Sequence, residues 1–303
     1  MKKIVILFLS VLIIGVIYIY RNDIVSFVLN YSKESKKEIV IPKVNEYKKK
    51  DDSYKYVSNT DNFIPKSKQD ILDIIYTTLD SGWDEFTFYC PEEYKNCVDD
   101  VVEITNDDVV LSNINGFVHP YNSFKSIETA YTTQGKITLN IHKIYNDEMI
   151  SKINKVVDKV ILEQLNGSMS IEEKLKTIHD YIIKNSKYDN ERISGITKYN
   201  SNTAYGNLIE GYGICSGYTD SMAIFLDKLG IPNYKISSSE HIWNLVYINN
   251  KWLNLDLTFD DPVANTGEDI LQHDYFLIDT NKLLELDKDE HTFDETVFVE
   301  AVS

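Results

Sequence analysis

Positive charge is scarce in this sequence. Its 303 residues include 31 Lys and Arg against 47 Asp and Glu, which gives a formal net charge of −16. A protein that binds nucleic acid neutralises phosphates with Lys and Arg, so this balance argues against a nucleic-acid partner. We interpret the acidity as that of a solvated surface.

Cysteine is also scarce, with only Cys90, Cys97 and Cys215 in the chain. In an exported protein the first two are able to form a disulfide, which leaves Cys215 as a single free thiol. The alternative is that Cys90 and Cys97 are reduced residues of the core. An unpaired thiol outside the cell calls for a reason, and the residues around Cys215 suggest one.

Charge is absent from residues 4–20, a run that is long for a signal-peptide core and short for a membrane-spanning helix. No small-x-small cleavage motif follows and no cysteine is there to be lipidated, so residues 1–21 predict an uncleaved signal anchor. Lys2 and Lys3 predict a cytoplasmic N-terminus. The expected location is the cell membrane, single-pass, with the body on the extracytoplasmic side. The alternative is a cleaved signal peptide.

The length predicts about two globular units. Hydrophobic residues make up 43% of the chain and aromatic residues 12%, so most of it is expected to fold. Residues 22–64 are polar and rich in lysine without a sustained apolar period, which predicts a stalk. Residues 65–166 predict a small α+β domain, and residues 167–303 the domain that carries the chemistry.

Local patterns define the small domain. Apolar spacing predicts a helix over 67–80, and Pro91 suits the first position of a second helix. Gly135 marks a β-hairpin, and Asn146 or Asp147 caps a further helix. No residue of this segment carries evident chemistry, so we assign it to positioning, substrate recognition or shielding of the site.

The first helix of the second domain is predicted from Ser170, because Ser170 and Glu173 form a capping box. His179 lies beside the apolar stripe of this helix. Buried histidines with satisfied hydrogen bonds are far more common than chemical ones, so we interpret His179 as structural.

Cys215 stands at the predicted start of another helix. Gly211 and Gly213 allow a tight backbone approach before it, and apolar residues recur at helical spacing until Gly230 ends the helix. The free amides of a first helical turn favour negative charge, which stabilises a thiolate where a nucleophile is needed. The alternative is a small buried hydrophobic residue.

A second hairpin brings His241 and Asp256 together. Residues 242–248 and 251–259 are strand-like, and the Asn249-Asn250 pair fits a two-residue turn because asparagine tolerates positive φ. In that register His241 lies diagonally next to Asp256 on one face. The opposite face is apolar, with Ile242, Val246, Ile248, Leu253, Leu255 and Leu257. The hairpin is thus predicted to have a core side and a chemical side.

The order Cys215, His241, Asp256 is the one that a thiol-based acyl-transfer enzyme needs. Cys215 attacks a carbonyl carbon, His241 takes and returns the proton, and Asp256 orients the imidazole. The Cys215 backbone N–H helps to hold the oxyanion. The spacing does not choose among the further candidate donors, which are Tyr205, Asn207 and Tyr212.

These stretches resemble the transglutaminase-like superfamily, a branch of the papain-like thiol enzymes, especially its bacterial membrane-attached members. The resemblance covers about residues 170–294. It rests on Gly213-Ile214-Cys215-Ser216-Gly217-Tyr218, His241-Ile242-Trp243-Asn244, Trp252 through Asp256, Thr258-Phe259-Asp260-Asp261-Pro262, His179-Asp180-Tyr181 and Tyr275-Phe276-Leu277. It implies an α+β, papain-like core with the cysteine at a helix N-terminus packed on an antiparallel sheet, and Cys215, His241 and Asp256 as the triad.

The resemblance also implies a substrate class: peptide, Gln side-chain or isopeptide amides of protein or peptide substrates, with the cell envelope as one source. The outcome is cross-linking or hydrolysis, since the superfamily includes transferases, amide hydrolases, peptidases and inactive domains. The alternative is a non-catalytic scaffolding or adhesion module that retains the fold. The calcium sites of animal transglutaminases have no recognisable counterpart in this sequence, so no metal and no cofactor are expected.

Overall fold

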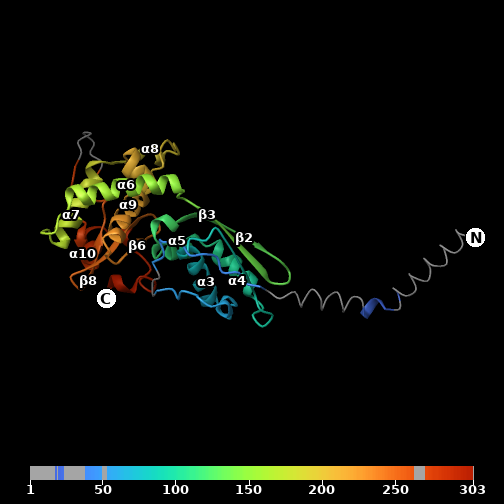
Figure 1. Cartoon of the computed structure of the whole chain (residues 1–303). Coiled ribbons are helices and arrows are strands. Elements are labelled where there is room, and N and C mark those ends of the chain that lie inside the picture. Colours follow the sequence, from blue (N-terminus) through green and yellow to red (C-terminus); the bar gives the residue numbers. More distant parts are fainter. Residues whose placement is uncertain (1–17, 19, 24–37, 50–52, 263–269, 303) are drawn as a thin grey trace, which may run out of the picture. The chain divides into compact units, whose positions relative to one another are not determined.

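A computed structural model describes residues 18, 20–23, 38–49, 53–262 and 270–302 (Figure 1). Residues 41–303 form one compact unit. Among the described residues no helix is both long and apolar enough to cross a membrane. The predicted anchor, apart from Tyr18, Tyr20 and Arg21, lies outside the described residues.

The first part of the compact unit is a three-stranded antiparallel sheet with helices beside it. The strands are β1 (Glu85–Tyr89), β2 (Phe124–Tyr131) and β3 (Lys136–Lys143), in the order β1-β3-β2. The helices are η1 (Thr60–Phe63), α3 (Lys68–Asp80), α4 (Cys97–Thr105), α5 (Asp108–Gly116) and η2 (Pro120–Asn122). Alternate residues of β3, Ile137, Leu139 and Ile141, are buried as predicted. Figure 1 shows the long β2–β3 hairpin beside α4.

The hairpin itself is confirmed, with Gly135 at a φ of 79°. Its loop consists of residues 132–135, because β2 ends at Tyr131 and β3 begins at Lys136. The Thr132 hydroxyl closes this loop, because it accepts the Lys136 N–H at 3.2 Å.

The helix predicted from Pro91 was placed too early, since α4 begins at Cys97. A disulfide joins Cys90 to Cys97, with Cα atoms 5.7 Å apart. Between them the chain forms turns in which the Tyr94 and Cys97 N–H groups donate to the carbonyls of Pro91 and Tyr94. A helix over the same residues would place the two ends too far apart to bridge.

The second part contains a four-stranded antiparallel sheet in the order β6-β7-β8-β9. Its strands are β6 (Asn233–Ser237), β7 (Ile242–Ile248), β8 (Lys251–Leu255) and β9 (Phe276–Ile278). Three long helices belong to this part: α6 (Asp147–Gln164), α7 (Ile171–Lys184) and α9 (Cys215–Lys228). α9 packs on β6 and β7, and α7 packs on α9, so α9 lies between helix and sheet (Figure 1).

Short elements complete this part of the chain. They are β4 (Lys187–Tyr188), α8 (Asn190–Ile193), the π-helical turn η3 (Gly206–Glu210), β5 (Tyr212–Gly213), α10 (Thr280–Leu286), α11 (Lys288–His291) and η4 (Val299–Val302). β4 pairs in parallel with β5 directly before α9. Glycine at position 217 is needed in α9, because a Cβ there would lie 2.3 Å from the Ser201 carbonyl oxygen. The start of α9 is thus held tightly by the preceding loop.

The predicted β7–β8 register is confirmed, since Ile248 pairs with Lys251 and Asn244 with Leu255. Asn249 and Asn250 have φ values of 51° and 59°, as a two-residue turn of this kind requires. β8 ends at Leu255, four residues earlier than predicted.

The early end of β8 has a local cause. The Asp256 Oδ1 atom accepts the Thr258 and Phe259 N–H groups at 2.9 and 3.2 Å. A carboxylate that bonds the backbone just ahead of it forms a turn in place of a strand ladder.

Most of both faces of the β7–β8 hairpin is buried, including the face predicted to carry the chemistry, on which Tyr247 is 37% exposed. Val246 and Leu255 on the apolar face belong to the core that contains α9. Trp243 and Leu245 on the other face are also buried. The cause is the first part of the unit: α5 packs against β6, and Phe117 after α5 contacts the ring of Tyr234 in β6.

A buried ion pair in the second part is hydrogen-bonded to two residues that precede it in the chain, Ser123 and Tyr145. The Lys235 ammonium in β6 lies 3.1 Å from Asp220 Oδ1 in α9 and 3.0 Å from the Ser123 hydroxyl, and the lysine is 1% exposed. Asp220 Oδ2 accepts the Tyr145 hydroxyl at 2.6 Å. These contacts cross the predicted boundary between residues 166 and 167, and the division into two domains there stays a prediction.

Replacement of Asp220 should therefore destabilise the protein strongly. In Asp220→Ala the Lys235 ammonium stays buried without its charge partner, which costs about 3–5 kcal/mol of unfolding free energy. The matched control is Asp158→Ala, because Asp158 pairs with Lys228 at 2.7 Å while both side chains are about half exposed. The control should cost less than about 1 kcal/mol. Urea denaturation followed by tryptophan fluorescence measures both, and equal losses would contradict the role given to Asp220.

Candidate active site

Cys215 is the first residue of α9. It is a free cysteine of intermediate exposure, whereas Cys90 and Cys97 are joined to each other. The preceding residue, Ile214, is extended and provides no side-chain cap. The first amides of a helix have no carbonyl partner within the helix, so the thiol lies among N–H groups that are able to bind an anion.

His241 and Asp256 come from neighbouring strand ends. His241 directly precedes β7 and Asp256 directly follows β8, so the register of the hairpin brings them together. The His241 Nε2 atom lies 2.5 Å from Asp256 Oδ2, and the two residues are 6% and 1% exposed. The Cys215 side chain also lies close enough to His241 to raise the pKa of that imidazole. The structure thus brings the three predicted residues together.

The electrostatics of the pair favour its charged form. Burial by itself lowers the pKa of His241, but the Asp256 charge, the bond to Asp256 and the contact with Cys215 outweigh burial and raise that pKa to about 10. Burial likewise raises the pKa of Asp256, yet the charges and hydrogen bonds of His241 and His291 hold it well below its usual range. The geometry therefore supports an imidazolium–carboxylate pair at neutral pH.

His291 is a fourth member of the site that sequence reasoning missed. Its Nε2 atom lies 3.0 Å from Asp256 Oδ2, and its Nδ1 atom lies 3.0 Å from the Asp287 carbonyl oxygen. Both partners are acceptors, and a neutral imidazole donates from one nitrogen only, so both contacts are satisfied when each nitrogen carries a hydrogen. No local pattern points to His291, because it lies in a four-residue helix far along the chain from Asp256.

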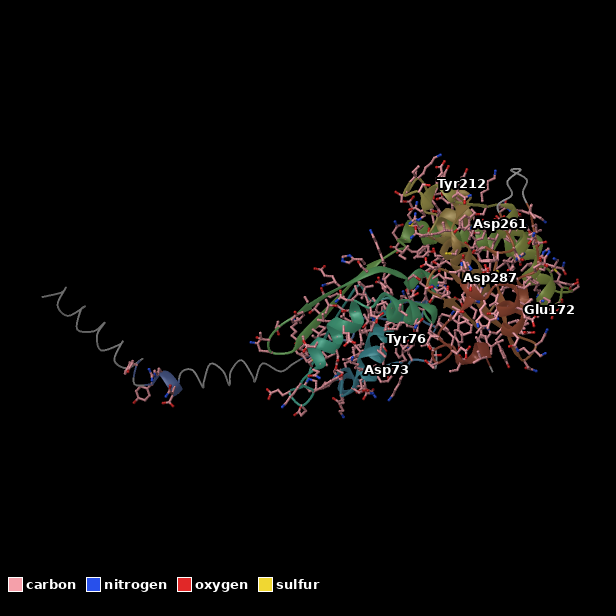
Figure 2. The ribbon with its side chains drawn as sticks, turned by 180° about the vertical axis from the view of Figure 1, so that it is seen from behind. Asp73, Tyr76, Glu172, Tyr212, Asp261 and Asp287 are labelled. Carbon is pink, nitrogen blue, oxygen red and sulfur yellow. A yellow bond between two sulfur atoms is a disulfide. The ribbon has the colours of Figure 1, made fainter. Side chains whose placement is uncertain are left out.

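Other polar residues near the site have partners of their own. Asn207 Nδ2 donates to the Ser186 hydroxyl at 2.6 Å, and the Tyr212 ring stacks on Tyr199 with centroids 3.9 Å apart. The Tyr205 hydroxyl lies 3.3 Å from the Lys152 ammonium. Figure 2 shows Tyr212 in the same part of the unit as Asp261 and Asp287. These contacts leave the first turn of α9 as the better candidate for an oxyanion site.

Tyr188 is a further residue near the cysteine. Burial raises its pKa, and the charges of Cys215 and Asp256 add to that effect. It lies in β4, whose pairing with β5 places it opposite Gly213. We identify Tyr188 as a candidate wall of the substrate site.

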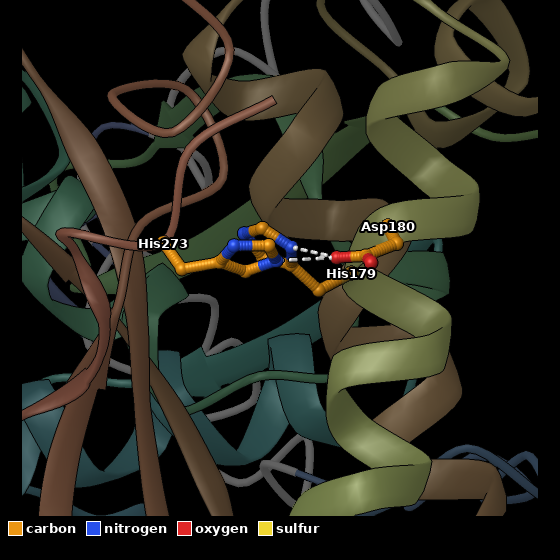
Figure 3. A group of neighbouring side chains, drawn as sticks. All are labelled: His179, Asp180 and His273. Atoms are coloured by element: carbon orange, nitrogen blue, oxygen red, sulfur yellow. Dashed lines mark hydrogen bonds and ion pairs between the residues drawn. The ribbon is translucent and has the colours of Figure 1, made fainter. Parts of the chain in front are cut away.

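His179 is fully buried and has a partner at each ring nitrogen, which agrees with the structural interpretation of that residue. Its Nδ1 lies 3.1 Å from Asp180 Oδ1, and its Nε2 lies 3.1 Å from Asp260 Oδ2. In the described part of the chain two groups have the composition and spacing to hold a metal ion. They are His179, Asp180 and His273 (Figure 3), and His241, Asp256 and His291.

The part of the chain that contains these residues is similar to a known protein family. A family profile described as "Transglutaminase-like superfamily" matches residues 159–257, a range that contains Cys215, His241 and Asp256. No curated protein matches the chain.

Two solved structures align with it at low similarity. The first, described as a "TGase", is 15% identical with a TM-score of 0.31, over 45% of this chain and 44% of its own. The second, a "putative cysteine protease" from Cytophaga hutchinsonii, is 16% identical with a TM-score of 0.28, over 45% of this chain and 62% of its own. The chain thus spans less than two thirds of either protein.

The charge pair predicts a window of pH in which it stabilises the fold. Because the folded pKa of His241 is about 10 against 6.5, the contribution of His241 is complete below pH 6.5 and is lost as the pH rises through about 10. The lowered pKa of Asp256 makes its contribution complete above pH 3.8 and lost as the pH falls further. We expect wild type to exceed His241→Gln in unfolding free energy by the largest margin between those limits.

Urea denaturation of wild type and His241→Gln at stepwise pH tests this window. The difference should shrink steadily between about pH 6.5 and 10. The exposed histidine of β3 provides the control, because His142→Gln should give a small difference over the same range. A difference for His241→Gln that stays flat up to pH 10 would rule out the charged pair.

Proposed function

Because residues 159–257 belong to the transglutaminase-like superfamily, we propose that the chain is a thiol-dependent acyl-transfer enzyme with Cys215, His241 and Asp256 as its triad. Enzymes of this superfamily act on protein or peptide substrates, and the proposed substrates here are peptide, Gln side-chain or isopeptide amides. One observation carries the proposal: His241 contacts Asp256 through one ring nitrogen and Cys215 through its side chain, at the start of a helix.

The first half of the reaction forms a thioester. The Cys215 sulfur attacks the amide carbonyl carbon, and the carbonyl electron pair moves to oxygen. The amides at the start of α9 stabilise that oxyanion. His241 then gives its proton to the leaving nitrogen as the carbon–nitrogen bond breaks, and ammonia or an amine departs. Because Asp256 Oδ2 holds Nε2, the proton is exchanged at Nδ1.

The second half resolves the thioester. His241, now neutral, takes a proton from water or from a primary amine, whose oxygen or nitrogen attacks the carbonyl carbon. Collapse of the intermediate expels the Cys215 thiolate, and the proton on His241 restores the ion pair. Water gives hydrolysis and an amine gives a cross-link, so the same residues serve both outcomes.

Asp256 has two roles in this scheme. It fixes the orientation of His241, and its charge favours the imidazolium that forms during each half-reaction. Its own position is fixed from three directions, by the Thr258 and Phe259 amides and by His291. We assign His291 as a positioning residue that keeps Asp256 ionised and oriented.

We also propose that the enzyme works outside the cytoplasm, attached to the cell membrane by residues 1–21. The apolar N-terminal run of the sequence supports this location. The Cys90–Cys97 disulfide supports it independently, because such bonds persist in oxidising compartments. Fractionation of cells that produce the full-length chain tests the attachment: recovery of a soluble chain starting near residue 21 would contradict an uncleaved anchor.

The competing proposal is a scaffolding or adhesion module that retains the fold without catalysis. Against it stands the cost of burying charged groups: the His241–Asp256 pair replaces side chains that would pack without any desolvation penalty. A scaffold gains nothing from a free thiol directed at that pair.

The reactivity of Cys215 separates the two proposals. Iodoacetamide should alkylate Cys215 faster in wild type than in His241→Ala, because His241 takes the proton of the attacking thiol. We expect the rate in His241→Ala to be lower by about tenfold or more at each pH tested. Mass spectrometry of the Cys215 peptide follows the reaction.

Two further variants make that experiment decisive. His142→Ala removes an exposed histidine and should leave the rate unchanged, whereas Cys215→Ser should take up no label. If His241→Ala reacts like wild type at every pH, the enzyme proposal fails.

A glutamine peptide offered together with a labelled primary amine tests the reaction itself. A transferase incorporates the amine and releases ammonia, and a hydrolase releases ammonia or cleaves the backbone without incorporation. Each product should decrease by about 10³-fold or more in Cys215→Ala and in His241→Ala. Product yields that are equal in wild type and both variants would contradict the proposed triad.

A further inference from the structure

A second group of polar side chains converges beside α7, outside the proposed triad. His179 and Asp180 belong to α7, and His273 lies just before β9. Asp180 Oδ1 lies 3.1 Å from His179 Nδ1 and 2.7 Å from His273 Nε2 (Figure 3). The side chain of His179 is buried, while those of Asp180 and His273 are 22% and 33% exposed. Solvent, and an ion carried by it, can therefore reach the group.

Asp260 fixes the tautomer of His179. The Asp260 side chain is fully buried, and its Oδ2 atom lies 3.1 Å from His179 Nε2 while its Oδ1 atom accepts the Tyr275 N–H at 3.0 Å. A buried carboxylate at that distance requires a hydrogen on Nε2, which leaves a lone pair on Nδ1 of the neutral ring. A carboxylate behind a histidine is the usual support of a metal-binding imidazole.

The remaining contacts are satisfied either by a second hydrogen on His179 or by a bound cation. The Nδ1 lone pair of His179 faces Asp180 Oδ1, which is itself an acceptor. His273 Nε2 faces Asp180 Oδ1 and, at 2.5 Å, the Lys176 ammonium, so one nitrogen would have to donate and accept at once. A cation placed between the three atoms satisfies them, because each contributes a lone pair to it, and the Lys176 ammonium then has to turn away from His273 Nε2.

We propose that His179 Nδ1, Asp180 Oδ1 and His273 Nε2 bind a divalent transition-metal ion, with Zn²⁺ as the first candidate. Two imidazoles and one carboxylate suit zinc, which leaves a fourth position for water. Neighbouring ligands of a tetrahedral zinc lie about 3.3 Å apart. The three ligand atoms lie within 4.8 Å of one another, so small side-chain adjustments bring them to that spacing.

The ion would connect α7 to the two segments that bond the Asp256 backbone, one at Asp260 and the other at Tyr275. The Asp260 N–H donates to the Asp256 carbonyl at 3.3 Å, and the Asp256 N–H donates to the Tyr275 carbonyl at 3.1 Å. His273 lies two residues before Tyr275, and His179 holds Asp260. The proposal concerns a structural site and does not depend on the proposed acyl-transfer reaction.

The test uses the full-length chain with Cys215→Ser, because a free thiol binds zinc itself. After treatment with a chelator the protein is loaded with Zn²⁺, separated from free metal and analysed by elemental mass spectrometry. We expect one zinc per chain, and with Co²⁺ the visible absorption of a site with nitrogen and oxygen ligands. Titration calorimetry should show that His273→Ala and Asp180→Asn each weaken zinc binding by at least about tenfold.

Two matched variants sharpen the result. Lys176→Met should strengthen zinc binding, because it removes an ammonium that competes for His273 Nε2. His142→Ala, which removes an exposed histidine near Glu128, should leave binding unchanged. Circular dichroism establishes that each variant is folded.

Two outcomes would overturn the proposal. If the Cys215→Ser chain retains no zinc and shows no cobalt absorption, a second hydrogen on the His179 ring, and no metal ion, satisfies its contact with Asp180. If it retains zinc but His273→Ala and Asp180→Asn bind equally well, the ion lies at another site, such as the group formed by His241, Asp256 and His291.

Discussion

The buried pair of His241 and Asp256 is the constraint on which this structure depends. A carboxylate that is 1% exposed is tolerated only when every lone pair has a donor, and Asp256 obtains its donors from two backbone amides and two imidazoles. Those donors come from the strand end, the following turn and α11. The fold around the site can thus be understood as the set of contacts that keeps one negative charge stable out of water.

A second buried ion pair, Lys235 with Asp220, stabilises the fold away from the site. Lys235, Asp220 and Tyr145 join β6, α9 and the segment after β3. Because Asp220 lies in the same helix as Cys215, this network also fixes the helix whose first turn holds the thiol. Two ionic networks therefore contact α9. The Lys235–Asp220 pair contacts the middle of the helix, and the His241–Asp256 pair lies beside Cys215 at its N-terminal end.

Local chemistry explains what the sequence allowed us to predict. The Ser170–Glu173 capping box, the Asn249-Asn250 turn and the β7–β8 register each depend on residues a few positions apart, and all are present. Errors arose where distant residues intervene. The helix expected at Pro91 is replaced by turns closed by the disulfide, and the sheet that contains the hairpin packs against α5 at β6. His291 was missed because only the tertiary fold brings it to Asp256.

The position of His291 in the chain changes what counts as the smallest complete unit. The family match ends at residue 257, directly after Asp256. A fragment cut at that point would contain the cysteine, the histidine and the aspartate, yet it would lack β9, the Tyr275 carbonyl that receives the Asp256 N–H, and the imidazole that faces Oδ2. The carboxylate of such a fragment would lose these contacts, so the set of residues that buries Asp256 extends beyond the matched range, through α11.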